Sequence, residues 1–103
     1  MKTKVRVGRQ VEDFLKALAP EPRRTLRLTM KNLADEKGDV KLLEGKLSGL
    51  WRLRAGKVRV IYETKAVGGM REIFCFYANY RSVVYVILEQ LVASGLIEEL
   101  KQN

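Results

Sequence analysis

Apolar and polar residues alternate along the chain in short patterns that predict strands and helices in turn. Lys2 to Val7 alternates with period two and stops at Gly8, which indicates an edge strand. From Arg9 to Leu18 the apolar residues recur every three or four positions, which predicts a helix with one buried stripe. Pro20 and Pro22 end this helix, because neither can donate a backbone hydrogen bond.

A second helix is predicted from Pro22 to about Lys37, with Gly38 at its end. The short link between the two helices implies an antiparallel pair. Residues 39–49 follow as a connector rich in lysine, glycine and leucine.

Three strands are predicted after the connector, at residues 50–54, 58–63 and 71–77. In the first, Trp51 and Leu53 lie on one side, and we expect Trp51 to belong to the core. The third is apolar on both faces, which is typical of a central strand.

The carboxyl end combines β-branched residues with a helical stripe, and we favour a helix from 83 to about 93. A break at residues 94 and 95 and a short helical tail would follow. The whole predicts one α+β domain spanning residues 1–103. It has an N-terminal strand, an antiparallel helix pair, a three- to four-stranded antiparallel sheet and a C-terminal helix. The helix pair would cover one face of the sheet, alternating arginines would line the other, and the tail 94–103 would be mobile.

Positive charge is concentrated in the first part of the chain. Residues 1–60 hold 16 Lys and Arg against 7 Asp and Glu, whereas residues 61–103 hold 4 against 5. The net charge of +8 favours a polyanion or an acidic protein as partner. A well-solvated surface is the alternative explanation of the asymmetry.

The rarer residue types exclude several function classes. Cys75 is the single cysteine, so an intramolecular disulfide is impossible, and we expect it to be buried. The 103 residues contain no histidine, which removes the usual general base and the commonest zinc ligand. The longest apolar run, residues 83–88, is too short to span a membrane, and the amino end has no hydrophobic block. These features predict a cytoplasmic protein without cofactor, metal or membrane partner.

One segment carries a recognisable motif. Residues 51–62 read WRLRAGKVRVIY, after the lead-in LEGKLSGL at 43–50, and YRSVVY follows at 80–85. This stretch resembles the RelE/ParE superfamily of bacterial and archaeal toxins, whose strands carry W-R-x-R-x-G-x-x-R-V-I-Y. The resemblance covers roughly residues 3–88 and implies a RelE-like fold.

The resemblance implies the toxin of a toxin–antitoxin module. RelE-type members bind the ribosome and cleave mRNA without a metal, by attack of a 2′-hydroxyl on the adjacent phosphate. Guanidinium groups suit this reaction because they stay charged and donate hydrogen bonds in a planar fork. The implied partners are the ribosome, mRNA and an acidic antitoxin. The free toxin would be a monomer and the antitoxin complex a hetero-oligomer.

The resemblance also implies roles for individual residues. Arg59, Arg81, Tyr85 and Lys57 are the candidate catalytic residues. Arg59 would stabilise the transition state, Tyr85 would stack on a base or relay a proton, and Lys46 or Lys57 could replace a missing base. The candidate RNA-binding residues are Arg52, Arg54 and Lys46. For the arginines, an ordinary surface role is the alternative, and for Tyr85 it is packing within its apolar run.

The sequence also departs from the family's pattern. Leu50 and Arg52 stand on the strand where RelE-type enzymes carry lysines, and arginine is a poor base. Asn79 stands where some members have a second arginine. A ParE-like inhibitor of DNA gyrase without nuclease activity, and a non-toxic basic RNA-binding domain, therefore remain alternative functions.

Overall fold

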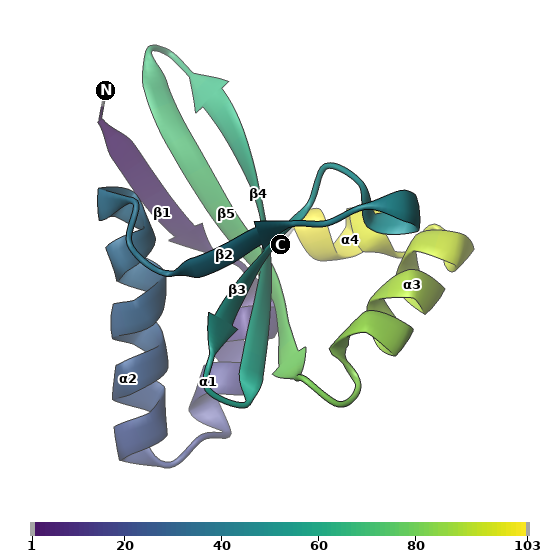
Figure 1. Ribbon diagram of the computed structural model, residues 1–103, viewed down its shortest axis with the longest axis horizontal. Coiled ribbons are helices and arrows are strands. Elements are labelled where there is room, and N and C mark those ends of the chain that lie inside the picture. Colours follow the sequence, from purple (N-terminus) through teal and green to yellow (C-terminus); the bar gives the residue numbers. More distant parts are fainter. Residues whose placement is uncertain (1, 103) are drawn as a thin grey trace.

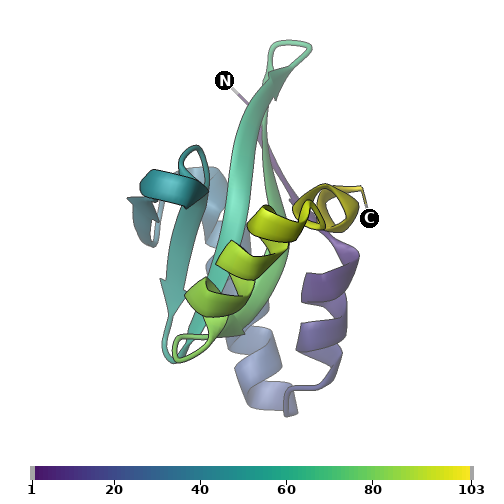
Figure 2. The ribbon, with the colours of Figure 1, turned by 90° about the vertical axis from the view of Figure 1, so that its right-hand side faces the viewer.

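The chain folds into a five-stranded sheet with helices on both faces (Figures 1 and 2). This computed structural model describes residues 2–102, so the two terminal residues of the predicted 1–103 domain lie outside the described part. The strands are β1 (Thr3–Val7), β2 (Asp39–Leu42), β3 (Trp51–Ala55), β4 (Val58–Val67) and β5 (Met70–Tyr80). The helices are α1 (Arg9–Lys16), α2 (Pro20–Lys31), α3 (Val84–Ser94) and α4 (Ile97–Lys101), with 3₁₀ turns η1 (Asn32–Asp35) and η2 (Gly45–Leu47).

The sheet has one strand more than predicted and is mixed rather than antiparallel. Its order is β1-β5-β4-β3-β2, with β1 parallel to β5 and every other pair antiparallel. The predicted edge position of β1 and the central position of β5 are confirmed. The additional strand is β2, within the segment predicted as a connector. All four of its residues are exposed, so it lacks the burial pattern by which a strand is recognised.

The predicted antiparallel helix pair packs on one face of the sheet, which we call the helix-pair face. Its core is formed by these buried residues: Val11, Leu15, Leu26, Met30, Leu33, Leu53, Val60, Tyr62, Ile73, Cys75 and Ala78. Trp51 packs against this core and stacks on Tyr62 with ring centroids 6.2 Å apart, as expected. Helix α2 ends at Lys31 rather than near Lys37, because the chain tightens into η1 and then reaches Glu36 at φ 58°.

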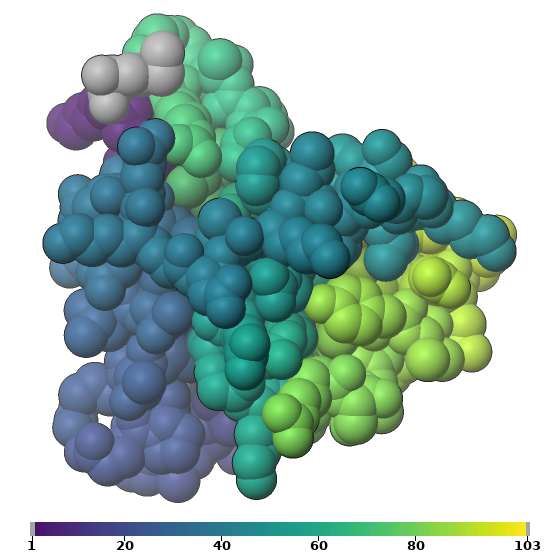
Figure 3. Space-filling view, viewed as in Figure 1, coloured from purple at the N-terminus to yellow at the C-terminus, as the bar shows by residue number. Residues whose placement is uncertain are grey.

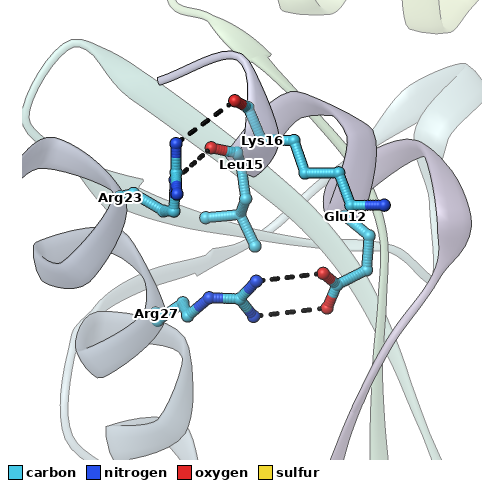
Figure 4. A network of polar contacts seen from close by, with 5 residues as sticks. All are labelled: Glu12, Leu15, Lys16, Arg23 and Arg27. Atoms are coloured by element: carbon cyan, nitrogen blue, oxygen red, sulfur yellow. Dashed lines mark hydrogen bonds and ion pairs between the residues drawn. The ribbon is translucent and has the colours of Figure 1, made fainter. Parts of the chain in front are cut away.

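Two arginines of α2 join the helix pair together (Figure 4). Arg23 donates hydrogen bonds to the carbonyls of Leu15 (3.0 Å) and Lys16 (3.3 Å) at the C-terminal end of α1 and to that of Leu18 (2.8 Å) just after it. Arg27 forms a two-pronged ion pair with Glu12 at 3.1 and 3.3 Å, and the hydrogen bond from Arg27 to Glu12 raises the pKa of the guanidinium. Part of the basic charge of α2 therefore serves the fold.

The opposite face, which we call the C-terminal face, carries a second core where alternating arginines were predicted. This prediction is only partly correct, because α3, α4 and η2 cover most of that face (Figure 2). The second core consists of Leu47, Leu50, Ile61, Phe74, Phe76, Tyr77, Val84, Leu88 and Ile97. Among the described residues, four arginines remain on that face: Arg6 of β1 lies over the Phe74 ring, and Arg52, Arg54 and Arg59 lie on β3 and β4.

The carboxyl-terminal segment expected to be mobile is packed against the sheet as α4. Ile97 is buried, and the Lys101 ammonium lies 3.1 Å from the Glu63 carboxylate and over the Phe76 ring. The break between α3 and α4 falls at Gly95, whose φ of 77° favours glycine. Helix α3 starts at Val84, one residue later than predicted.

Candidate nucleic-acid interface

A row of polar side chains crosses four strands of the C-terminal face. Asp39, Arg54, Arg59 and Asn79 are successive register partners on β2, β3, β4 and β5. They share this face because their sequence neighbours, such as Leu53 and Val60, fill the core on the other side. The alternation seen in the sequence thus places two of the predicted arginines in one row.

The β3–β4 hairpin brings three further candidates to the same end of the sheet. The backbone N–H of Arg81 donates to the carbonyl of Lys57 at 2.8 Å, which fixes the start of α3 beside the hairpin tip (Figure 2). The side chains of Lys57 and Arg81 are exposed. Tyr85 lies in the first turn of α3, half-buried against the second core. Lys57, Arg81 and Tyr85 therefore gather around the end of the row.

Arg59 differs from the other arginines because it is buried. It is 8% exposed, and its Nη1 donates to the carbonyls of Gly56 (2.8 Å) and Val58 (3.0 Å). Its guanidinium therefore holds the backbone of its own hairpin. The neighbouring Asn79 donates to the Tyr77 hydroxyl at 3.0 Å and accepts from the backbone N–H of Tyr80.

Arg52 and Arg54 share one carboxylate, that of Asp39. The Arg52 Nη2 lies 3.3 Å from Asp39 Oδ1, and the Arg54 Nη1 lies 3.9 Å from Oδ2. The Arg52 side chain is only 15% exposed, and its Nε is buried without a hydrogen-bond partner in residues 2–102. Sequence reasoning missed Asp39, because the strand that carries it was read as a connector.

Lys46 is the one predicted site residue that the structure places elsewhere. It lies in η2, before β3 begins, whereas Arg54, Lys57 and Arg59 lie at the hairpin end of β3 and β4 and Arg52 lies near the start of β3. Both ribbon views show η2 well separated from the hairpin tip (Figures 1 and 2). Lys46 is exposed there and does not join the row.

The described residues supply few groups for other chemistry. Cys75 is fully buried as predicted, and burial raises the pKa of its thiol to about 12. Burial also raises the pKa of Tyr62. Within residues 2–102, acidic residues and cysteine form no group of three that could hold a metal ion. In the same range, no helix combines the length and apolarity needed to cross a membrane.

The fold and these side chains together define a class: a small α+β domain with arginines gathered at one end of its sheet. Solved structures resemble it over most of its length. A chain of the RelBE2 toxin–antitoxin complex from Mycobacterium tuberculosis matches with a TM-score of 0.63 and 21% identity, covering 79% of this chain and 100% of that one. A chain of the archaeal RelE–RelB complex from Pyrococcus horikoshii OT3 matches at 0.58 and 29%, covering 79% and 97%.

A third solved structure also resembles this chain. The YoeB/ParE toxin from Agrobacterium tumefaciens matches with a TM-score of 0.59 and 16% identity, covering 76% of this chain and 98% of that one. No family model matches the sequence, and a search of curated proteins finds no relative. The chain has the fold of RelE/ParE superfamily toxins, which confirms the resemblance drawn from residues 51–62.

Proposed function

We propose that this protein is the toxin of a toxin–antitoxin pair and acts as a ribosome-dependent mRNA endoribonuclease. One observation carries the proposal: on a toxin fold, Arg52 and Arg54 share one face of β3, and the contact of Arg81 with the hairpin adds a third guanidinium at the end of the sheet. Several fixed positive charges at one end of a sheet suit a reaction that builds negative charge on phosphate.

The reaction would proceed by transfer of the phosphoryl group within the RNA. A 2′-hydroxyl attacks the adjacent phosphorus, the bond to the 5′-oxygen of the next nucleotide breaks, and that oxygen takes up a proton. Arg81 would stabilise the extra charge on the phosphate oxygens from its exposed position, while Arg52 and Arg54 would hold flanking phosphates. Tyr85 would stack on a base or pass on the proton.

The reaction also needs a general base to take the proton of the 2′-hydroxyl. Arginine keeps its proton, so the base would be Lys57 at the hairpin tip. Its exposure and its backbone contact with Arg81 place it beside the other candidates. Lys46, the other lysine considered, lies too far along the sheet to share that role.

A reconstituted translation reaction tests the proposal directly. Purified protein is added with and without ribosomes, and the reporter mRNA is mapped by primer extension. The expected result is cleavage within translated codons only when ribosomes are present. Intact mRNA and normal translation in both reactions would contradict the proposal.

Matched variants then test the site. Arg81→Gln and Tyr85→Phe should each reduce cleavage by about 10²-fold or more, the usual effect of removing one transition-state contact. Arg24→Gln is the control, because Arg24 is an exposed arginine of α2 on the other side of the sheet. Equal cleavage by the Arg81 and Arg24 variants would overturn the assignment of Arg81.

A second function, inhibition of DNA gyrase without nuclease activity, is favoured by the state of Arg59. Its guanidinium is buried and bound to hairpin carbonyls instead of facing an open site. A gyrase supercoiling assay with the purified protein distinguishes the two functions. Loss of supercoiling together with intact mRNA would select this alternative.

We also infer an acidic antitoxin as partner, on the basis of the +8 net charge and an apolar groove. The groove has a volume of about 580 Å³ and lies between α2 and the β3–β4 hairpin, which border each other in Figure 3. Leu18, Leu26 and Val58 supply apolar walls, and Lys57 lies at its rim. An amphipathic segment with acidic flanks would fit both features.

Co-expression with the neighbouring small acidic gene product tests this partner. Thr25→Glu, in the groove, should weaken the complex, because it sets a negative charge against an acidic segment. Leu28→Glu is the control, since Leu28 is 57% exposed on α2 and does not line the groove. Equal binding by both variants, or the absence of any such gene beside this one, would contradict the inference.

A further inference from the structure

The carboxylate of Asp39 lies between two arginines of β3, Arg52 and Arg54. Its oxygens are 3.3 Å from Arg52 Nη2 and 3.9 Å from Arg54 Nη1. A phosphate group has the same charge sign and offers more acceptor oxygens. Asp39 therefore occupies a position that an RNA phosphate could take.

The arginines hold this carboxylate loosely. Hydrogen bonds between guanidinium and carboxylate are usually about 2.7–2.9 Å long, and both contacts here are longer. The Nε of Arg52 is buried and has no partner among residues 2–102, so this guanidinium retains unused donor capacity. An anion with a third oxygen could use it.

The Asp39 side chain is also free to leave the two arginines. Asp39 is the first residue of β2, an edge strand of four exposed residues paired with β3. Its side chain is 56% exposed, so the carboxylate can turn into solvent by rotation of the side chain while the backbone stays in place.

We propose that Asp39 is an internal substitute for an RNA phosphate, which the bound nucleic acid displaces from Arg52 and Arg54. Asp39 thereby lowers the affinity of Arg52 and Arg54 for any polyanion that does not reach this position. It acts as a specificity-determining residue and keeps an arginine-rich surface from binding RNA indiscriminately. That the displacing anion is RNA rests on the proposed function, whereas the anion site rests on the two arginines.

Binding measurements on charge-matched variants test the proposal. Fluorescence anisotropy with a short single-stranded RNA compares the wild type, Asp39→Asn, Asp39→Glu and Asp35→Asn at several salt concentrations. Asp35→Asn is the matched control, because it raises the net charge equally at an exposed residue four positions earlier. Asp39→Asn should bind about three- to fivefold more tightly than either the wild type or Asp35→Asn, the scale of one surface ion pair. Asp39→Glu keeps the carboxylate and should bind like the wild type.

Two further readouts connect the effect to the arginines. The slope of log affinity against log salt should be the same in Asp39→Asn and the wild type, because the same phosphate contact forms in both once Asp39 is displaced. The gain should disappear in the Asp39→Asn/Arg52→Gln double variant. A thermal midpoint for each variant confirms that the compared proteins are folded.

Tripolyphosphate, as a competitor, separates this proposal from the proposed function, because it presents phosphate oxygens without ribose or bases. Tighter binding of tripolyphosphate by Asp39→Asn, combined with intact mRNA in the translation reaction, would support the anion site and reject the nuclease. Cleaved mRNA with equal binding by Asp39→Asn and Asp35→Asn would reject the role of Asp39 and leave the nuclease standing. A gain that persists without Arg52, or no binding of either probe, also overturns the proposal.

Discussion

Replacement of Arg59 by glutamine is expected to destabilise the fold, whatever its effect on RNA. Arg59 is 8% exposed and donates two hydrogen bonds, to the carbonyls of Gly56 and Val58. A hydrogen bond from a charged donor contributes about 1.5–3 kcal/mol to stability. Gly56 is exposed, so water can replace the hydrogen bond to its carbonyl. The loss of stability therefore comes mainly from the hydrogen bond to Val58 and from the buried aliphatic part of the Arg59 side chain. The expected decrease in the free energy of unfolding is about 2 kcal/mol, or about 8–16 °C in Tm for a domain of this size.

Urea denaturation followed by circular dichroism measures this decrease. Arg81→Gln is the matched control, since Arg81 is exposed, and it should remain within about 0.5 kcal/mol of the wild type. If Arg59→Gln were as stable as this control, Arg59 would not be a structural clamp of the hairpin. The outcome decides how any loss of activity at Arg59 is interpreted, because an unfolded protein is inactive for reasons unrelated to catalysis.

Three further predictions concern the rest of the fold. Gln10→Ala should lower the free energy of unfolding by about 2–3 kcal/mol, because the Gln10 side-chain amide accepts a hydrogen bond from the N–H of the buried Ala78 (2.8 Å) and donates one to its carbonyl (2.9 Å). Arg9→Ala, at the exposed neighbouring residue, is the control in the same urea titration. Ile97→Ala should release α4 and expose it to limited proteolysis, whereas Leu96→Ala, at a residue 45% exposed, should not; equal cleavage of the two would contradict the docking of α4. Burial raises the pKa of Cys75 to about 12 in the folded state, so the folded protein favours the protonated thiol. The stability that depends on this protonated thiol is fully present below the pKa of the unfolded state and is lost as the pH rises above it. Between about pH 8.5 and about pH 10 the wild type should therefore lose about 1 kcal/mol more than Cys75→Ala, and parallel pH profiles would refute the shift.

Most of the fold could be predicted from periodicity, because its elements bury one regular face. The stripes of α1 and α2, the alternation of β3 and the apolar β5 all follow from residues such as Leu15, Leu26 and Leu53. Strand β2 could not be predicted, since Val40 and Leu42 are both exposed and the strand exists only through pairing with β3. The parallel pairing of β1 with β5 could not be predicted either, because it depends on tertiary packing and not on the local pattern of residues.

The candidate site was predicted as residues rather than as a geometry. The motif identified Arg52, Arg54 and Arg59, but it could not show that Arg59 turns back onto its own hairpin. Nor could it show Asp39 between the other two arginines, because that contact depends on the register of an unrecognised strand. The exclusion of Lys46 follows from the path of η2 in space.

A single irregularity in β5 determines which residues belong to the row. Between Ile61 and Tyr62 the register slips, so that Ile61 faces Tyr77 while Tyr62 faces Cys75. Phe76 is the extra residue, and both Phe76 and Tyr77 therefore point into the second core. With strict alternation, Phe76 and Ala78 would share one face and Asn79 would point toward the helix pair. The bulge reverses this order, places Ala78 in the helix-pair core and brings Asn79 beside Arg59. Because Phe76 and Tyr77 are both apolar, the sequence gives no sign of the reversal, although the composition of the site depends on it.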